Sequence, residues 1–295
     1  MIILGTVLER LQWDIESIKS LFNEFLLKYS EIKYSPLPNN GVVVFIASDY
    51  HWGKLDDEGK VLQNRLYKEY KSFTELCRIL ISDLPSDKIH SFDECSREIV
   101  EYIEQNRMIW LESTNEVLQR VLIRLEEQYS ILKTLYDSKT DTYIVIPDTN
   151  ALLSSPSFEK WHFKDISTFE ILFLPTVLSE LDRLKVYHSN RDVKEKASSI
   201  IKRIKELRSR GNLADGAAIV KHKIFARTIA IEPDFENTLP WLKQDNDDDR
   251  IIASLVEVMR QHPNCNIILV TADINLQNKI EFARLPFIEP PEEIQ

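Results

Sequence analysis

Acidic residues in the C-terminal half of the sequence are spaced as a cation-binding cluster would require. Asp148 and Asp273 each follow a short apolar run, and Glu180 and the triplet Asp247–Asp249 lie between them. Carboxylates that converge repel one another, so such a cluster makes physical sense only around cations. Oxygen ligands without Cys or His favour Mg²⁺ or Mn²⁺.

Each of these residues also has an ordinary structural explanation. A single Asp after a strand commonly caps a turn or a helix, and a single Glu on an amphipathic helix commonly faces solvent. The run Asn246–Asp249 is equally consistent with a helix N-cap. The order of the acidic residues, with apolar runs before two of them, makes the set a stronger signal than its members.

Alternating strand and helix patterns position these acids. Short apolar runs predict strands at residues 143–146, 171–174, 225–231 and 266–270. Helical spacing predicts helices from 175, over 193–210 with Gly211 as C-cap, and over 248–261 and 273–282. Such alternation predicts an α/β fold with a parallel sheet covered by helices on both faces. Asp148 and Asp273 then lie at the carboxyl edge of the sheet, where ligands bind.

The N-terminal half is predicted to be a mostly α-helical domain of unknown role. Apolar residues at helical spacing predict helices at about 1–30, 60–82 and 92–136, and the run 41–47 predicts a short strand or a buried segment. The wide apolar stripe of the longest helix favours packing in a bundle over a two-stranded coiled coil. A polar linker at 137–141 predicts domains 1–138 and 139–295.

Four short motifs in the C-terminal half resemble those of PIN-domain nucleases. Val145–Asn150 looks like the opening strand with its D-T-N motif, and Leu178–Asp182 is similar to the family's glutamate helix. Asn246–Ile252 resembles the N-D-D-x-I helix start with one extra Asp, and Val270–Leu276 resembles the T-x-D-x-N-L strand end. The resemblance covers about residues 141–290 and leaves the N-terminal half unassigned.

This resemblance implies that Asp148, Glu180, Asp248 and Asp273 are catalytic and hold one or two Mg²⁺ or Mn²⁺ ions. The extra Asp leaves the third position open. Asp248 is preferred because Ile251 then takes the buried position three residues later, and Asp249 is the ligand if Ile252 takes it. The residues implied to orient the carboxylates, or to bind water and phosphate, are Thr149, Asn150, Thr271 and Asn275.

The resemblance also implies a metal-dependent endonuclease that acts on RNA or single-stranded nucleic acid, in a toxin-like or defence-associated role. A bound ion would activate water for attack on phosphorus, leaving a 5′-phosphate and a 3′-hydroxyl. Two alternatives remain open. One is a catalytically silent PIN fold that binds RNA or serves as a scaffold, and the other is a structure-selective DNA nuclease.

A basic stretch follows Glu180. Residues 183–210 hold ten Lys and Arg against three Asp and Glu, an excess of seven positive charges. Such a stretch suits phosphate contacts, although a solvated helix face laced with ion pairs is about equally consistent with it. The residues expected to bind nucleic acid are Arg183, Lys185, Arg191, Lys202, Arg203 and Arg250.

Composition restricts the remaining classes. The net charge is −10, with 43% hydrophobic and 28% charged residues, which is typical of a soluble globular protein. Three isolated cysteines exclude a disulfide framework and disfavour a zinc site. Without a predicted signal peptide or membrane span, we expect a cytoplasmic protein. We also expect a protein partner, or self-association, through the N-terminal helices.

Overall fold

The computed structural model describes residues 7–36, 49–106, 109–111, 113–136, 142–230 and 232–292. The chain forms two compact units, one spanning Leu8–Leu135 and the other containing Tyr136–Gln295. The boundary expected between residues 138 and 139, within the predicted linker, falls outside the described residues. The predicted strand at 41–47 also lies outside them. The two units are described separately.

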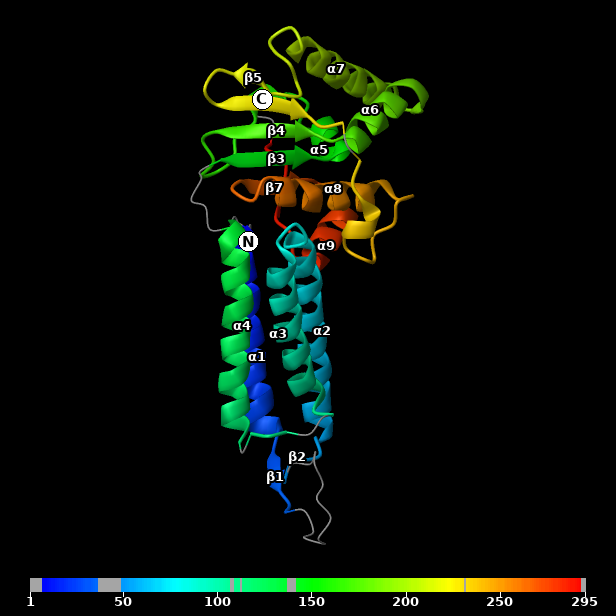
Figure 1. Cartoon of the computed structure of the whole chain (residues 1–295). Coiled ribbons are helices and arrows are strands. Elements are labelled where there is room, and N and C mark those ends of the chain that lie inside the picture. Colours follow the sequence, from blue (N-terminus) through cyan, green and yellow to red (C-terminus); the bar gives the residue numbers. More distant parts are fainter. Residues whose placement is uncertain are drawn as a thin grey trace. The chain divides into compact units, whose positions relative to one another are not determined.

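The described residues of the first unit form a bundle of four long helices. These helices run side by side (Figure 1). They are α1 (Val7–Glu24), α2 (Asp57–Leu80), α3 (Ser86–Glu104) and α4 (Thr114–Tyr136). Each helix buries one apolar stripe, as Ile15 and Phe22 do on α1. A π-helical turn, Phe25–Tyr29, extends α1, and β1 (Ile32–Tyr34) pairs antiparallel with β2 (Tyr50–Trp52).

The single long helix expected over residues 92–136 is wrong, because the chain breaks there into α3 and α4. Gln105 adopts a left-handed conformation with φ of 53° and ends α3. Ser113 then accepts a hydrogen bond from the backbone N–H of Glu116 at 3.3 Å, near the start of α4. Apolar periodicity continues on both sides of this break, which is why the pattern alone concealed it.

A buried chain of polar groups joins three helices of the bundle. The Tyr70 hydroxyl on α2 donates to Gln128 Oε1 on α4 at 3.1 Å, and Gln128 Nε2 donates to Ser96 Oγ on α3 at 2.7 Å. Tyr70 and Gln128 are almost fully buried. Because buried polar groups are costly when unpaired, these bonds specify one alignment of the helices.

The second unit is a six-stranded sheet in the order β5-β6-β4-β3-β7-β8. All neighbouring strands are parallel except β5 and β6. The strands are β3 (Tyr143–Pro147), β4 (Phe169–Phe173), β5 (Ala217–Val220), β6 (Ile224–Thr228), β7 (Asn266–Val270) and β8 (Phe287–Ile288). Every residue of β7 is buried, as expected for a central strand covered on both faces.

Five α-helices in the described part of this unit accompany the sheet. They are α5 (Thr149–Ser154), α6 (Pro175–Tyr187), α7 (Arg191–Leu207), α8 (Asp247–Gln261) and α9 (Ile274–Phe282). Two single 3-10 turns, Phe158–Lys160 and Phe235–Asn237, lie in the connections. The predicted α/β class with a mostly parallel sheet and a helical N-terminal region is confirmed.

The predicted end of α7 is wrong. The helix stops at Leu207 with Arg208 as its C-cap, so Gly211 lies beyond it. The backbone N–H groups of residues 208–210 each bond the carbonyl three residues earlier, so the chain tightens before it reaches the glycine. Among the described residues, no helix combines the length and apolar character needed to cross a membrane.

The buried polar chain gives a testable stability effect. Replacing Gln128 by Leu removes the acceptor of the buried Tyr70 hydroxyl and leaves it only Ser96, at a cost of about 1–3 kcal/mol. Adding Tyr70→Phe to Gln128→Leu removes this under-bonded hydroxyl, so we expect the double variant to recover part of the loss. Hydrogen exchange of the α2 and α4 amides measures both effects. A double variant with protection no better than that of Gln128→Leu would contradict this account.

Candidate metal centre

The chain order of the strands places a switch point at the carboxyl edge of the sheet, and the region of Asp148, Glu180 and Asp273 beyond it is here named the crevice. From β3 the chain continues to β4 on one side, and it returns later to β7 on the other side of β3. Such a switch in strand order is where open α/β sheets bind ligands. Asp148 follows β3 directly and Asp273 follows β7 by three residues, and Asp148 N–H donates to the carbonyl of Val270 at 3.0 Å. The topology therefore brings these two acids to one crevice.

Asp148 is a buried carboxylate, with only 3% of the residue exposed. One oxygen accepts from the backbone N–H of Ala151 at 2.6 Å and so caps α5, and the other accepts from the Thr271 hydroxyl at 2.5 Å. Burial, together with the charges of Asp273 and Glu180, raises the pKa of Asp148 to about 6 against the lowering effect of these two hydrogen bonds. The structure thus holds a carboxylate whose charge is only partly compensated.

Glu180 and Asp273 reach the same crevice from two other helices. Pro175 begins α6 just after β4, and Glu180 lies in the second turn of that helix, where Thr149 Oγ1 donates to Glu180 Oε2 at 2.7 Å. Asp273 caps α9 by accepting from the backbone N–H groups of Asn275 and Leu276. Its second oxygen accepts from Asn150 Nδ2 at 3.1 Å. Asp148, Glu180 and Asp273 are thus connected through neighbouring residues.

Three of the four residues expected to orient the carboxylates contact them through their side chains. They are Thr149, Asn150 and Thr271. Thr271 Oγ1 also accepts from the backbone N–H of Asp273 at 3.0 Å, so one hydroxyl connects two of the acids. Asn275 differs, because its hydrogen bond to Asp273 comes from the backbone and its side chain is exposed.

The third acidic position lies at the start of α8. Asn246 is the N-cap and accepts from Asp249 N–H at 3.1 Å. Asp249 is buried, and its oxygens accept from Lys243 N–H at 3.0 Å and from Lys279 Nζ at 2.8 Å. The side chain of Asp248 is 38% exposed, and Lys279 Nζ contacts it at 3.2 Å. Ile251 and Ile252 are both buried, so the isoleucine criterion does not choose between the two aspartates.

Lys279 is a site residue that the sequence did not reveal. Its ammonium group lies between Asp248 and Asp249, and it also contacts Asn246 Oδ1 at 3.2 Å. Burial lowers the pKa of Lys279, but its hydrogen bonds to Asp249 and Asp248 outweigh that effect and raise it, so the ammonium stays charged. The contact joins α8 to α9 across thirty residues of sequence, a separation at which no local pattern predicts a pair.

The donor chemistry of this centre suits a hard divalent cation. Asp148, Glu180 and Asp273 offer only oxygen atoms. Burial is the main cause that raises the pKa of Asp148, and a cation would relieve the repulsion from Asp273 and Glu180 that adds to it. As the side chains lie, however, no group of three or more Asp, Glu, His or Cys among the described residues is arranged to hold a metal ion. Hydrogen bonds from Thr149, Asn150 and Thr271 occupy carboxylate oxygens that an ion would need.

Comparison with known families decides the class of this unit. Residues 145–287 match the family model of the PIN domain. The C-terminal half of the chain is a PIN domain. The match confirms the resemblance of the four motifs, and PIN domains are generally nucleases that typically use Mg²⁺ or Mn²⁺. No curated protein matches the chain.

The six basic residues expected to bind nucleic acid all have carboxylate partners within the PIN domain. Arg183 pairs with Asp247 at 3.2 Å and approaches Glu180 at 3.9 Å, and Arg250 pairs with Glu232 at 2.6 Å. The other four pairs are Lys185–Asp182, Arg191–Glu195, Lys202–Glu206 and Arg203–Glu159. Exposed pairs are worth only about 0–1 kcal/mol, so a phosphate can replace the carboxylate at low cost. Their role in binding stays a prediction.

The raised pKa of Asp148 predicts a stability effect with a defined sign. A carboxyl group whose pKa is higher in the folded protein destabilises the fold when it ionises, so this penalty grows as the pH rises from about 4 through about 6. A shift of about two units corresponds to a penalty on the order of 3 kcal/mol at pH 8. Asn is an equally good N-cap, so Asp148→Asn should be more stable than the parent at pH 8 and similar at pH 4.

Urea unfolding in EDTA at both pH values measures this difference. The exposed Asp215, changed to Asn, serves as the control that removes a carboxylate outside the crevice. A gain for Asp148→Asn that is equal at pH 4 and pH 8 would contradict the assigned cause.

Proposed function

We propose that the PIN domain of this chain is a divalent-metal-dependent endoribonuclease that cleaves single-stranded RNA. The observation that carries the proposal is the buried carboxylate of Asp148, whose pKa is raised to about 6 by burial and by Asp273 and Glu180. Perturbed carboxylates in a crevice at the switch point of a sheet are typical of functional sites. A purely structural N-cap gains nothing from nearby negative charges.

In this proposal the acidic residues are the metal ligands. Asp148, Glu180 and Asp273 would hold one or two Mg²⁺ or Mn²⁺ ions, and Asp248 is the preferred fourth ligand because it is more exposed than Asp249 and has fewer hydrogen bonds. When bound, the ion lowers the pKa of water and neutralises charge on the phosphodiester. Thr271 fixes the orientation of Asp148, and Thr149 does the same for Glu180.

The substrate part of the proposal rests on charge near the crevice. Arg183 lies on α6, one turn beyond Glu180, and it bridges Glu180 and Asp247. A phosphate that displaces the carboxylates from Arg183 would lie next to the acidic residues. The basic residues of α7, including Lys194 and Lys205, would extend this contact along the strand, with an affinity that falls as salt rises.

A second candidate is a silent PIN domain that binds RNA without cleaving it. Lys279 favours it, because its ammonium occupies the acidic pair Asp248 and Asp249 where the nuclease reading places a ligand. Both candidates share RNA binding and differ in metal dependence.

Cleavage tests the leading candidate directly. With Mn²⁺, purified protein should cut single-stranded RNA, Asp148→Asn should abolish cutting, and Thr271→Val should lower the rate by roughly 10–100-fold through loss of orientation. Asp215→Asn is the matched control and should behave like the parent. Double-stranded RNA and flapped DNA belong in the same assay. Cutting that persists in EDTA and in Asp148→Asn would exclude the metal centre.

Metal binding separates the two candidates without relying on activity. Binding of Mn²⁺ to the native state alone raises stability, by about 2.7 kcal/mol at a hundredfold excess over Kd. Differential scanning fluorimetry should therefore show an upward shift in Tm for the parent and a smaller one for Asp148→Asn. Equal shifts in both proteins would count against the assigned ligands. No shift in the parent, with RNA binding retained, would favour the silent domain.

A further inference from the structure

The helical unit contains a pocket whose volume is about 690 Å³, and the proposed nuclease does not use it. Such a volume is in the range of about 300–1,000 Å³ that is typical of small-molecule sites. Three parts of the bundle supply its walls: β2 with Trp52, the α3 face with Arg97, Glu98, Glu101 and Tyr102, and the chain around α4 with Ile109, Trp110, Leu111 and Arg120.

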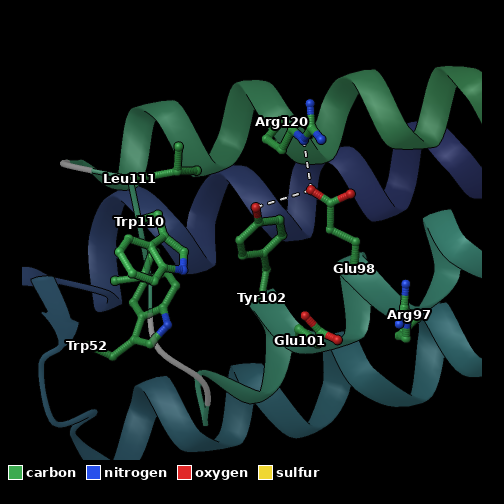
Figure 2. Close-up of a pocket in the computed structure, with 9 residues that line it drawn as sticks. Trp52, Arg97, Glu98, Glu101, Tyr102, Trp110, Leu111 and Arg120 are labelled. Carbon is green, nitrogen blue, oxygen red and sulfur yellow. Dashed lines mark hydrogen bonds and ion pairs between the residues drawn. The ribbon is translucent and has the colours of Figure 1, made fainter. Parts of the chain in front are cut away.

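One end of this pocket is aromatic. Figure 2 shows Trp52, Trp110 and Leu111 at that end, with Tyr102 beside them. Trp110 is 64% exposed although its neighbour Ile109 is buried and bridges to Tyr50, so the backbone that carries the indole is fixed while the ring stays accessible. Neither indole N–H has a hydrogen-bond partner among the described residues. An exposed tryptophan beside a half-buried one, Trp52, at a concave site is typical of ligand contacts.

The other end of the pocket is charged (Figure 2). Glu98 accepts from Arg120 Nε at 2.7 Å and from the Tyr102 hydroxyl at 3.3 Å. This bond uses one of the five N–H donors of the Arg120 guanidinium. The side chain of Arg97 is 67% exposed, and its ion pair with Glu94 is long, at 4.0 Å. The pocket therefore offers two guanidinium groups next to two carboxylates.

These two ends together restrict the chemistry of the occupant. A fully apolar molecule leaves the charged end unpaired, and an inorganic anion leaves the tryptophans unused. A quaternary ammonium ion suits the aromatic rings and Glu101 but is repelled by Arg97 and Arg120. A nucleotide satisfies both ends, because its base stacks on aromatic rings and its phosphate binds Arg. The carboxylates can accept hydrogen bonds from N–H groups on the base edge.

We propose that this pocket binds a nucleotide, with the base against Trp52 and Trp110 and the phosphate at Arg97 and Arg120. A free nucleotide and one nucleotide unit of an RNA strand offer this same chemistry. The site belongs to the helical unit alone and does not depend on nuclease activity. It gives the chain a nucleotide-binding site separate from its PIN domain.

Binding to the full-length protein tests the proposal. Tryptophan fluorescence and calorimetry, in EDTA, are used with AMP, GMP, ATP, GTP and a five-nucleotide RNA, and adenosine and guanosine serve as phosphate-free controls. We expect saturable quenching by at least one nucleotide, with one molecule bound per chain. Binding of mononucleotides identifies a free ligand, whereas binding of the RNA alone identifies a strand contact, and either result supports the site.

Two surface variants localise the site with little risk to folding. Trp110→Ala should weaken binding roughly 5- to 150-fold, which corresponds to the ~1–3 kcal/mol of one base stack. Arg97→Gln should weaken nucleotide binding and leave the weaker nucleoside binding unchanged, because it removes a phosphate contact. Trp13→Phe, at an exposed tryptophan on α1 outside the pocket, should bind like the parent.

Three outcomes would overturn the assignment. They are the absence of saturable binding by every nucleotide and by the RNA, binding that both pocket variants leave unchanged, and binding of tetramethylammonium in preference to nucleotides. Repeating the titration with Asp148→Asn distinguishes the two proposals. If the nuclease proposal is wrong, nucleotide binding to the pocket is still expected, and if the pocket proposal is wrong, RNA cleavage is still expected.

Discussion

The burial of one carboxylate, Asp148, constrains the whole crevice of the PIN domain. Its position follows from the switch in strand order around β3, which brings the ends of β3 and β7 together. Its two oxygens connect the start of α5 to Thr271 at the end of β7. Asp273 and Glu180, which are only half-buried, then add negative charge beside Asp148. A protein that keeps such repulsion must either bind a cation or accept a less stable fold.

The other acidic residues of the PIN domain, at the start of α8, are paired with basic side chains. Lys279 on α9 neutralises the acidic start of α8, and Arg183 on α6 reaches Asp247 in the same region. These internal cations explain how an acidic chain keeps three adjacent aspartates on one helix start. They also mean that negative and positive groups near the crevice compete. A phosphate and a metal ion would each replace one partner of an existing pair.

Much of the fold could be predicted from the sequence, since the central strands β3 and β7 are apolar runs buried on both faces. The crevice followed from their order. The short strands β5 and β8 gave no such signal, because four and two residues carry little periodicity. The break between α3 and α4 was missed because it depends on a left-handed Gln105 between two apolar stripes. Lys279 was missed because its partners lie about thirty residues away.

Glu98 belongs to two arrangements at once. It lines the pocket of the helical unit, and its ion pairs with Arg120 and Arg124 connect α3 to α4. A ligand that displaces Glu98 from Arg120 would break one of these two ion pairs. By reciprocal coupling, any force that separates α3 from α4 changes the affinity of the pocket. Packing of α3 against α4 and ligand binding in the pocket would therefore be thermodynamically coupled, so that a change in one alters the other.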